Sequence, residues 1–261
     1  MQVFIYLLIA LFATTAGAIA GISGGIIIRP LLDVLGDFDV RTIGALSSIT
    51  VLTMAFVSAA KQISQKVKIK YEIVLPLAIG ASLGGVSGQM VFSQIMGTFH
   101  DGSIVTAIQN SVLLLLVIAV FIYMQKREFI KCYNLRGIVS SVFVGLCLGI
   151  VSSFLGIGGG PINVALMTFL FSFDIKTAAV GSIVIIFFSQ LANVTLLAVR
   201  VGFGEFDLSM LPLMMIGAVA GGFIGAALNK KLSAKTVENC FNALLIIVIL
   251  ISGINIVTNL L

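Results

Sequence analysis

"GISGGIIIRP" (residues 21–30) places three glycines, an arginine and a proline inside a run that is otherwise as apolar as a membrane span. Each glycine costs a helix about 1 kcal/mol relative to alanine and permits backbone angles that other residues resist. The stretch therefore predicts an interruption of helical structure within an apolar segment. In lipid such an interruption is tolerated only where it is buried in protein or lines a watery cavity.

The rest of the chain has the composition of a polytopic membrane protein. Of its 261 residues, 59% are hydrophobic and only 10% are charged, and the mean hydropathy is +1.21. Apolar runs near the ~20 residues needed to cross the hydrocarbon core recur along the whole length, which predicts an all-α fold with the lipid bilayer as partner. Residues 1–20 could pass for a secretory signal, but they lack a basic start and a similar segment recurs in mid-chain, so we expect them to be retained.

A second glycine cluster, "GIGGGPIN" (156–163), lies over the first when residue 21 is aligned with residue 156. The same offset places "FDVRT" (38–42) over "FDIKT" (173–177). These matches predict two homologous halves within one integral membrane domain. The first membrane repeat covers 1–130 and the second covers 131–261.

Each half contains the same series of apolar segments. A long segment runs into the glycine cluster, a short one of about twelve residues follows, and three more come after it. At 1.5 Å per residue the last three of each half are long enough to span, whereas the short pieces reach only halfway and are candidate re-entrant half-helices. The long first segments are 3–21 and 137–156, the short pieces are 25–36 and 161–172, and the other six are 42–60, 73–96, 104–125, 176–199, 208–229 and 237–260.

The distribution of lysine and arginine favours hairpins at the glycine clusters. If the short pieces fold back, one side of the membrane holds Arg29, Arg41 and Arg200 and the other holds the remaining twelve basic residues. The positive-inside rule then places the 61–70 and 126–136 loops in the cytoplasm. Three full crossings per half would make the halves inverted. A full crossing in each first segment, with eight helices and parallel halves, stays open.

The glycine clusters are the predicted substrate site. A short helix after each cluster points its free N–H groups and its positive dipole end at the break, which favours an anion. Two broken segments at matching places are also a sequence indication of a transporter's central site. The candidate substrate-binding residues belong to the clusters or are polar residues of later apolar segments. They are Gly21, Ser23, Gly24, Gly25, Arg29, Ser47, Ser48, Gly156, Gly158, Gly159, Gly160, Pro161, Asn163, Ser182, Gln190 and Asn193.

Structural roles stay open for many of these residues. Glycines in membrane helices often serve close packing, which is what we expect of "GASLGG" (80–85) and "GAVAGG" (217–222). Arg29 either touches the substrate or extends to the nearest interface. The polar residues of later segments equally suit hydrogen bonds between helices. Asp39 and Asp174 are expected to cap helices.

The residues do not favour a metal site, a cofactor, an enzyme active site or a nucleic-acid partner. Three cysteines without CxxC spacing and a single histidine predict no metal site and no cofactor. The glycine clusters lack the Lys-Ser/Thr ending of a P-loop. Ser87 lies in a protease-like "GVSG", but the only histidine, His100, is too far along the chain to act as its base, so we do not expect an enzyme. The basic residues sit between apolar runs, which indicates topology and no nucleic-acid partner.

The sequences "GISGGIIIRPLLD" (21–33) and "GIGGGPINVALM" (156–167), each at the end of a first apolar segment, resemble the TauE/SafE sulfite exporter family, also called toluene-sulfonate uptake permeases. The resemblance implies secondary transport of sulfite or small organosulfur and carboxylate anions across the plasma membrane of a prokaryote, with about eight helices. The sequence departs from the family pattern at Ser23, where a third glycine is usual, and at Arg29, where many relatives have an apolar residue or lysine.

Several properties stay open at this stage, including the direction of transport and homo-oligomerisation. Glu72, Glu205 and Asp207 are candidate proton carriers, although an interfacial role suits them as well. The alternative function is a non-transporting membrane subunit of a larger complex, such as the permease partner of a separate ATPase.

Overall fold

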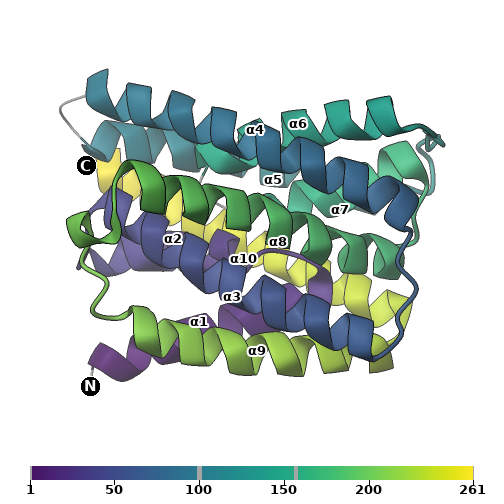
Figure 1. Ribbon diagram of the computed structural model, residues 1–261, viewed down its shortest axis with the longest axis horizontal. Coiled ribbons are helices and arrows are strands. Elements are labelled where there is room, and N and C mark those ends of the chain that lie inside the picture. Colours follow the sequence, from purple (N-terminus) through teal and green to yellow (C-terminus); the bar gives the residue numbers. More distant parts are fainter. Residues whose placement is uncertain (1, 99–101, 156–157, 261) are drawn as a thin grey trace.

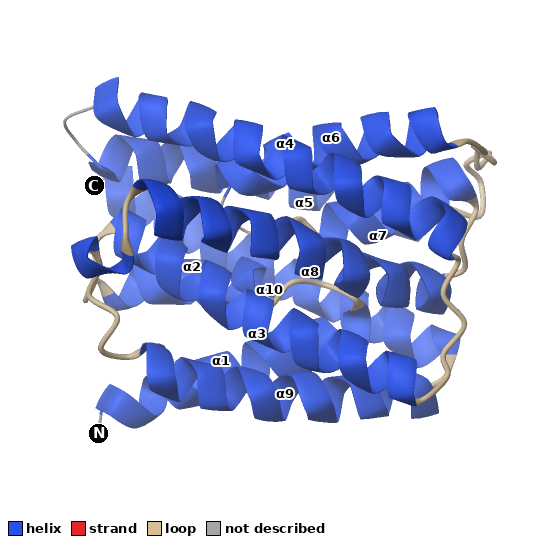
Figure 2. Ribbon diagram, viewed as in Figure 1, coloured by secondary structure: helices blue, strands red, loops and turns tan. Residues whose placement is uncertain are grey.

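The computed structural model describes residues 2–98, 102–155 and 158–260, which form ten α-helices and one short 3-10 helix, with no strand among them (Figures 1 and 2). This confirms the expected all-α fold. The elements are α1 (Gln2–Ala20), α2 (Gly25–Leu35), α3 (Val40–Ser64), α4 (Tyr71–Thr98), α5 (Gly102–Lys126), α6 (Ile138–Leu155), α7 (Gly160–Phe171), α8 (Ile175–Arg200), η1 (Phe203–Glu205), α9 (Leu211–Lys231) and α10 (Ala234–Leu260).

Seven of the described helices are long and apolar enough to cross a membrane. Six of them, α3, α4, α5, α8, α9 and α10, correspond to the segments that were expected to span. The seventh is α6, which has 18 residues. The short helices α2 and α7 have 11 and 12 residues, and at 1.5 Å per residue neither reaches across the hydrocarbon core.

The helices α1 and α2 fold back on each other. Near the start of α1 the Tyr6 hydroxyl donates a hydrogen bond to Asp37, which lies just beyond the end of α2. Residues 21–24, between the two helices, are not helical. The open end of this hairpin is at the left of Figure 1, beside the N-terminus.

The helices α6 and α7 form a second hairpin. The backbone N–H of Tyr133, before α6, donates to the Phe169 carbonyl near the end of α7 at 2.8 Å, and Leu135 donates to Leu170 at 2.8 Å. In Figure 1 the open end of this hairpin is at the right, opposite the open end of the first. The two hairpins therefore enter the helical bundle from opposite ends.

The loops that follow α3, α5 and α9 lie at the right-hand end of Figure 1, and together with the adjoining helix ends they carry most of the basic residues. There Lys176 donates to the Leu232 carbonyl at 2.8 Å and Lys230 donates to the Gln65 carbonyl at 3.1 Å, which ties three loops together. Lys61, Lys66, Lys68, Lys70, Lys126, Arg127, Lys131, Arg136, Lys176, Lys230, Lys231 and Lys235 belong to the segments at this end. Arg41 and Arg200 lie at the opposite end, at the start of α3 and the end of α8.

Glycine-rich faces of α4 and α9 pack directly on neighbouring helices. A Cβ on Gly84 would overlap the Leu146 carbonyl oxygen of α6, and one on Gly88 would lie 2.5 Å from the Ile150 oxygen. On α9, a Cβ on Gly217 would lie 2.9 Å from the Leu7 oxygen of α1. The absence of side chains thus lets the helix backbones approach, which confirms the packing role expected for these runs.

Two aspartates begin the helices that follow the hairpins. Asp39 accepts a hydrogen bond from the Thr42 N–H at 2.7 Å, and Asp174 accepts one from the Thr177 N–H at 3.0 Å. Both carboxylates thereby satisfy N–H groups that have no partner within the helix. The expectation that these residues cap helices is confirmed.

Candidate functional site

The chain segments that interrupt the two hairpins lie against each other. A Cβ on Gly160 would overlap the backbone nitrogen of Ser23 and lie 2.6 Å from the Ile22 Cα. Gly158, which has a left-handed φ of 68°, faces the Ser23 side chain, and a Cβ there would lie 3.1 Å from the Ser23 Cβ. We call this meeting of Ile22–Ser23 with Gly158–Gly160 the glycine junction. Glycine permits both the backbone angle and the close approach.

The N-terminal ends of two short helices converge on the glycine junction. The helix α2 begins at Gly25, with Gly24 as its N-cap, and α7 begins at Gly160, with Gly159 as its N-cap. Pro161 lies in the first turn of α7, where its missing N–H leaves no helical hydrogen bond unmade. Each N-terminus carries roughly half a positive charge, so the two helix ends make the potential at the junction positive.

The helix α8 lies along both interruptions and adds polar groups. Its Gln190 Nε2 lies 2.9 Å from the position that a Cβ on Gly158 would take. At the other interruption Gly21, with a φ of 73°, packs on Ala179. Ser182 is three residues beyond Ala179 and therefore shares its helix face. The Gln190 Oε1 and the Ser182 hydroxyl are buried and have no hydrogen-bond partner among the described residues.

The helix α6 contributes a second group of polar contacts beside the junction. A Cβ on Gly159 would overlap the Ser152 hydroxyl and lie 3.0 Å from Asn163 Oδ1. The Ser153 hydroxyl donates to Asn193 Oδ1 on α8 at 3.3 Å. Asn193 therefore makes a hydrogen bond between helices, which is one of the two roles left open for it.

Arg29 is buried, with 5% of its surface exposed, and its terminal nitrogens are used within the protein. Nη1 donates to the Leu155 carbonyl at 2.8 Å, and Nη2 donates to Gln109 Oε1. Gln109 in turn donates to the Phe154 carbonyl at 2.7 Å. Since Leu155 ends α6, the guanidinium compensates the free carbonyls and the negative dipole end of that helix. The expected alternative of reaching the interface does not occur.

Comparison with known proteins identifies the family of this chain. A family model described as sulfite exporter TauE/SafE matches residues 6–256. The chain belongs to the TauE/SafE family. It is a multi-pass plasma-membrane protein and a membrane transporter, in keeping with the seven spanning-type helices.

Curated relatives of this TauE/SafE protein come from bacteria and archaea. The probable membrane transporter proteins YunE and YjnA of Bacillus subtilis are 26% and 23% identical, and their alignments cover 95% and 96% of this chain and 96% and 98% of their own. The probable membrane transporter protein MJ0441 of Methanocaldococcus jannaschii is 24% identical over 88% of this chain and 87% of its own. No solved structure matches the chain.

Other candidate residues of the TauE/SafE protein lie around the junction or farther away. Gly24 packs on α1, where a Cβ would lie 3.1 Å from the Thr14 methyl, and Gly25 is buried. The Ser47 hydroxyl on α3 and the Thr50 hydroxyl one turn further along are both buried. Neither has a hydrogen-bond partner among the described residues. Ser48 is half-buried. Gly156 lies outside the described residues.

Sequence reasoning missed three polar residues that the TauE/SafE protein places near the junction. Gln109 shares the Arg29 contact, and Ser152 and Ser153 belong to the last turn of α6. Each is a polar residue in an apolar segment, within "AIQN" (107–110) and "VSSF" (151–154). The signal that selected Gln190 and Asn193 applies to them equally.

The acidic residues considered as proton carriers lie at the surface of the TauE/SafE protein. Glu72, Glu205 and Asp207 are all exposed. Hydrogen bonds from the hydroxyl and the backbone N–H of Ser209 lower the pKa of Asp207. Asp207 therefore stays ionised at physiological pH. The exposed Ser87 donates to the Leu83 carbonyl of its own helix, and His100 lies outside the described residues.

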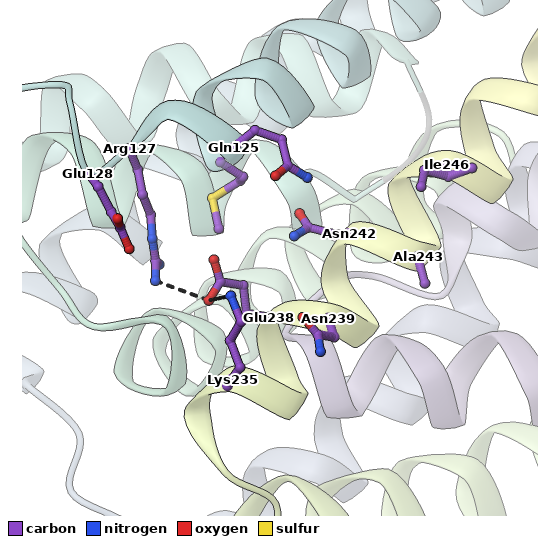
Figure 3. A pocket seen from close by; sticks show the side chains of 10 residues that line it. Gln125, Arg127, Glu128, Lys235, Glu238, Asn239, Asn242, Ala243 and Ile246 are labelled. Atoms are coloured by element: carbon purple, nitrogen blue, oxygen red, sulfur yellow. Dashed lines mark hydrogen bonds and ion pairs between the residues drawn. The ribbon is translucent and has the colours of Figure 1, made fainter.

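A polar pocket of about 450 Å³ lies between the end of α5 and the start of α10 (Figure 3). Three of its charged side chains pair with one another, because Glu238 accepts from Arg127 at 3.2 Å and lies 3.7 Å from Lys235. Figure 3 shows these three side chains pointing toward one another. This pocket belongs to the basic end of the molecule and contains none of the expected site residues.

Proposed function

We propose that this transporter moves small anions, such as sulfite, sulfonates or related organosulfur and carboxylate compounds, by alternating access around the glycine junction. The observation that carries the proposal is the convergence of the α2 and α7 N-termini on one buried point, beside the unpaired oxygen of Gln190. Broken helices whose N-termini face each other are a common way to bind an anion inside a membrane protein. The family description as sulfite exporters supports the choice of anion.

The residues proposed to contact the anion are those that border the junction. Gly158, Gly159 and Gly160 offer backbone N–H groups, Ser23 borders them, and Gln190 and Ser182 offer side chains from α8. Arg29 has a different role in this proposal, because its terminal nitrogens already bind Leu155 and Gln109. It positions the end of α6, which leads into the second glycine cluster.

We also infer that residues 1–130 and 131–261 are inverted repeats. In support, the hairpins open at opposite ends, and Asp39 and Asp174, which are counterparts in the repeat, both cap the next helix. Ser23 and Gly158 are counterparts as well, and they touch. A twofold axis in the membrane plane would therefore pass through the junction. Rocking of one repeat against the other would expose the site alternately to each side.

Reconstituted vesicles test this proposal directly. The purified protein in liposomes should take up sulfite, sulfoacetate, taurine or a carboxylate, measured with and without a pH gradient. Alanine at Gly160 should lower the uptake at least tenfold, because its Cβ would overlap Ser23 and separate the two hairpins. Gly253→Ala on α10 is the matched control, since a Cβ there meets nothing within 4 Å.

Two outcomes would contradict the proposed function. Uptake of a neutral or cationic solute without any anion would show that the junction is not an anion site. If no solute moves, and Gly160→Ala instead changes the binding of a partner protein, the chain is a non-transporting subunit.

A further inference from the structure

The buried charges of the protein constrain the charge of the anion. Among the described residues the buried charged side chains are Arg29 and Glu238. Arg29 binds the Leu155 carbonyl and Gln109, and Glu238 pairs with Arg127 and Lys235 at the basic end of the molecule. An anion at the glycine junction therefore meets no free cationic side chain from the described part of the chain.

The charge of Arg29 is offset by Asp33, which lies four residues further along α2 and interacts with it electrostatically. The remaining positive potential at the junction comes from the helix ends. Two N-termini, each with roughly half a unit charge, together match about one negative charge. The cost of moving an ion from water into a poorly polarisable interior grows with the square of its charge, so a dianion costs about four times as much as a monoanion. The junction is thus electrostatically matched to a monovalent anion.

The hydrogen-bonding groups add a second requirement. Gln190 is 3% exposed, and its Oε1 has no donor among the described residues. A carboxamide oxygen is an acceptor only, and a buried acceptor without a donor is destabilising. A ligand that carries an O–H group would satisfy it. The Gln190 side chain already reaches the junction, because its Nε2 faces Gly158.

We propose that the glycine junction binds a monovalent oxyanion that retains one hydrogen, with hydrogen sulfite bound in preference to the sulfite dianion and Gln190 Oε1 accepting that hydrogen. The inference rests on the proposed function and adds the protonation state to it. Sulfate has the wrong charge at neutral pH. Methanesulfonate has the right charge and lacks the hydrogen, so these two ions separate the two requirements.

Equilibrium binding to the purified full-length chain in detergent tests the charge requirement. The sulfite dianion takes up its first proton close to neutral pH, so the fraction of radiolabelled sulfite present as hydrogen sulfite falls about tenfold per pH unit in alkaline solution. The apparent Kd for total sulfite should rise by the same factor, and sulfate should compete weakly at every pH. The Kd of methanesulfonate should not change with pH, which shows that the protein itself is not titrating.

Gln190→Leu tests the hydrogen-bond requirement. It should weaken hydrogen sulfite binding about tenfold more than methanesulfonate binding, because both ligands lose the Nε2 donor and only hydrogen sulfite also loses the acceptor Oε1. Ser87→Ala, at an exposed serine of α4, is the control. Thermal unfolding checks that the Gln190→Leu variant is folded. If the variant does not fold, the pH series on the wild-type protein still tests the charge requirement.

Three results would contradict the proposal, and each contradicts a different part of it. A Kd for total sulfite that is constant or falls with rising pH overturns the choice of hydrogen sulfite and leaves anion transport standing. Equal loss of both ligands in Gln190→Leu overturns the role of Oε1. If neither anion binds at any pH while a neutral or cationic solute does, the proposed function itself fails.

Discussion

Arg29 carries a charge into the protein interior, and the protein uses that charge itself. Its partner Leu155 is 126 residues away in the sequence, at the end of the helix that leads into the second glycine cluster. At the offset that relates the two clusters, the counterpart of Arg29 is Val164 on α7. The two hairpins therefore differ in the means by which their ends are stabilised.

Removing this guanidinium should reduce stability. Arg29→Gln leaves the Leu155 carbonyl without its donor, and an unsatisfied buried carbonyl costs about 1–3 kcal/mol. Thermal unfolding in detergent measures the loss. A double-mutant cycle with Gln109→Leu should give a coupling energy of about 0.5–3 kcal/mol, as expected for residues in contact. An unchanged unfolding temperature together with abolished anion binding would instead make Arg29 a substrate ligand.

At the scale of elements, glycine determines how closely helices approach. On α4 the residues Gly80, Gly84 and Gly88 face the backbone of α6, and on α9 Gly217, Gly221 and Gly225 face α1. These contacts hold the first helix of each hairpin in place and so set the position of the glycine junction. Backbone contact of this kind leaves no room for even a methyl group.

Alanine at Gly84 is therefore expected to destabilise the fold. Its Cβ would overlap the Leu146 oxygen and push α4 and α6 apart, at a cost of about 1–3 kcal/mol. At Gly253 the same change should be neutral or stabilise the helix by up to about 1 kcal/mol. Chemical denaturation followed by circular dichroism compares the two. Equal effects would show that helix propensity outweighs the α4–α6 contact.

The sequence predicted where the helices lie along the chain better than it predicted which helices pack against each other. Apolar length and polar starts locate the helices, and the capping by Asp39 and Asp174 follows from residue type and position. Helix partners depend on how the whole chain folds, which a local pattern does not contain. For this reason neither the α4–α6 contact nor the bond between Arg29 and Leu155 was foreseen, although the glycines and the arginine were singled out.

At the scale of the whole molecule, the unequal charge of the two ends predicts its orientation. The end that holds the loops after α3, α5 and α9 carries most of the lysines and arginines. Basic loops remain in the cytoplasm during insertion. The turn containing η1 would then face the outside of the cell.

Labelling of single cysteines tests this orientation. Cys132, Cys147 and Cys240 are first replaced by serine, and a thiol is introduced at the exposed Gly204 or Lys68. A membrane-impermeant maleimide should label Gly204→Cys in intact cells and Lys68→Cys only after permeabilisation. Labelling of both positions from the same side would refute the orientation and the presence of a hairpin in each half.

The cross-packing of α1 on α9 and of α4 on α6 has a consequence for biosynthesis. When a ribosome has completed residues 1–130, α1 through α5 exist, but α6 and α9 do not. The glycine face of α4 then borders lipid, and α1 lacks the helix that covers it. The first half should thus be a substrate for membrane quality-control proteases until the second half emerges. Two separately expressed halves should accumulate together and be degraded when either is made without the other.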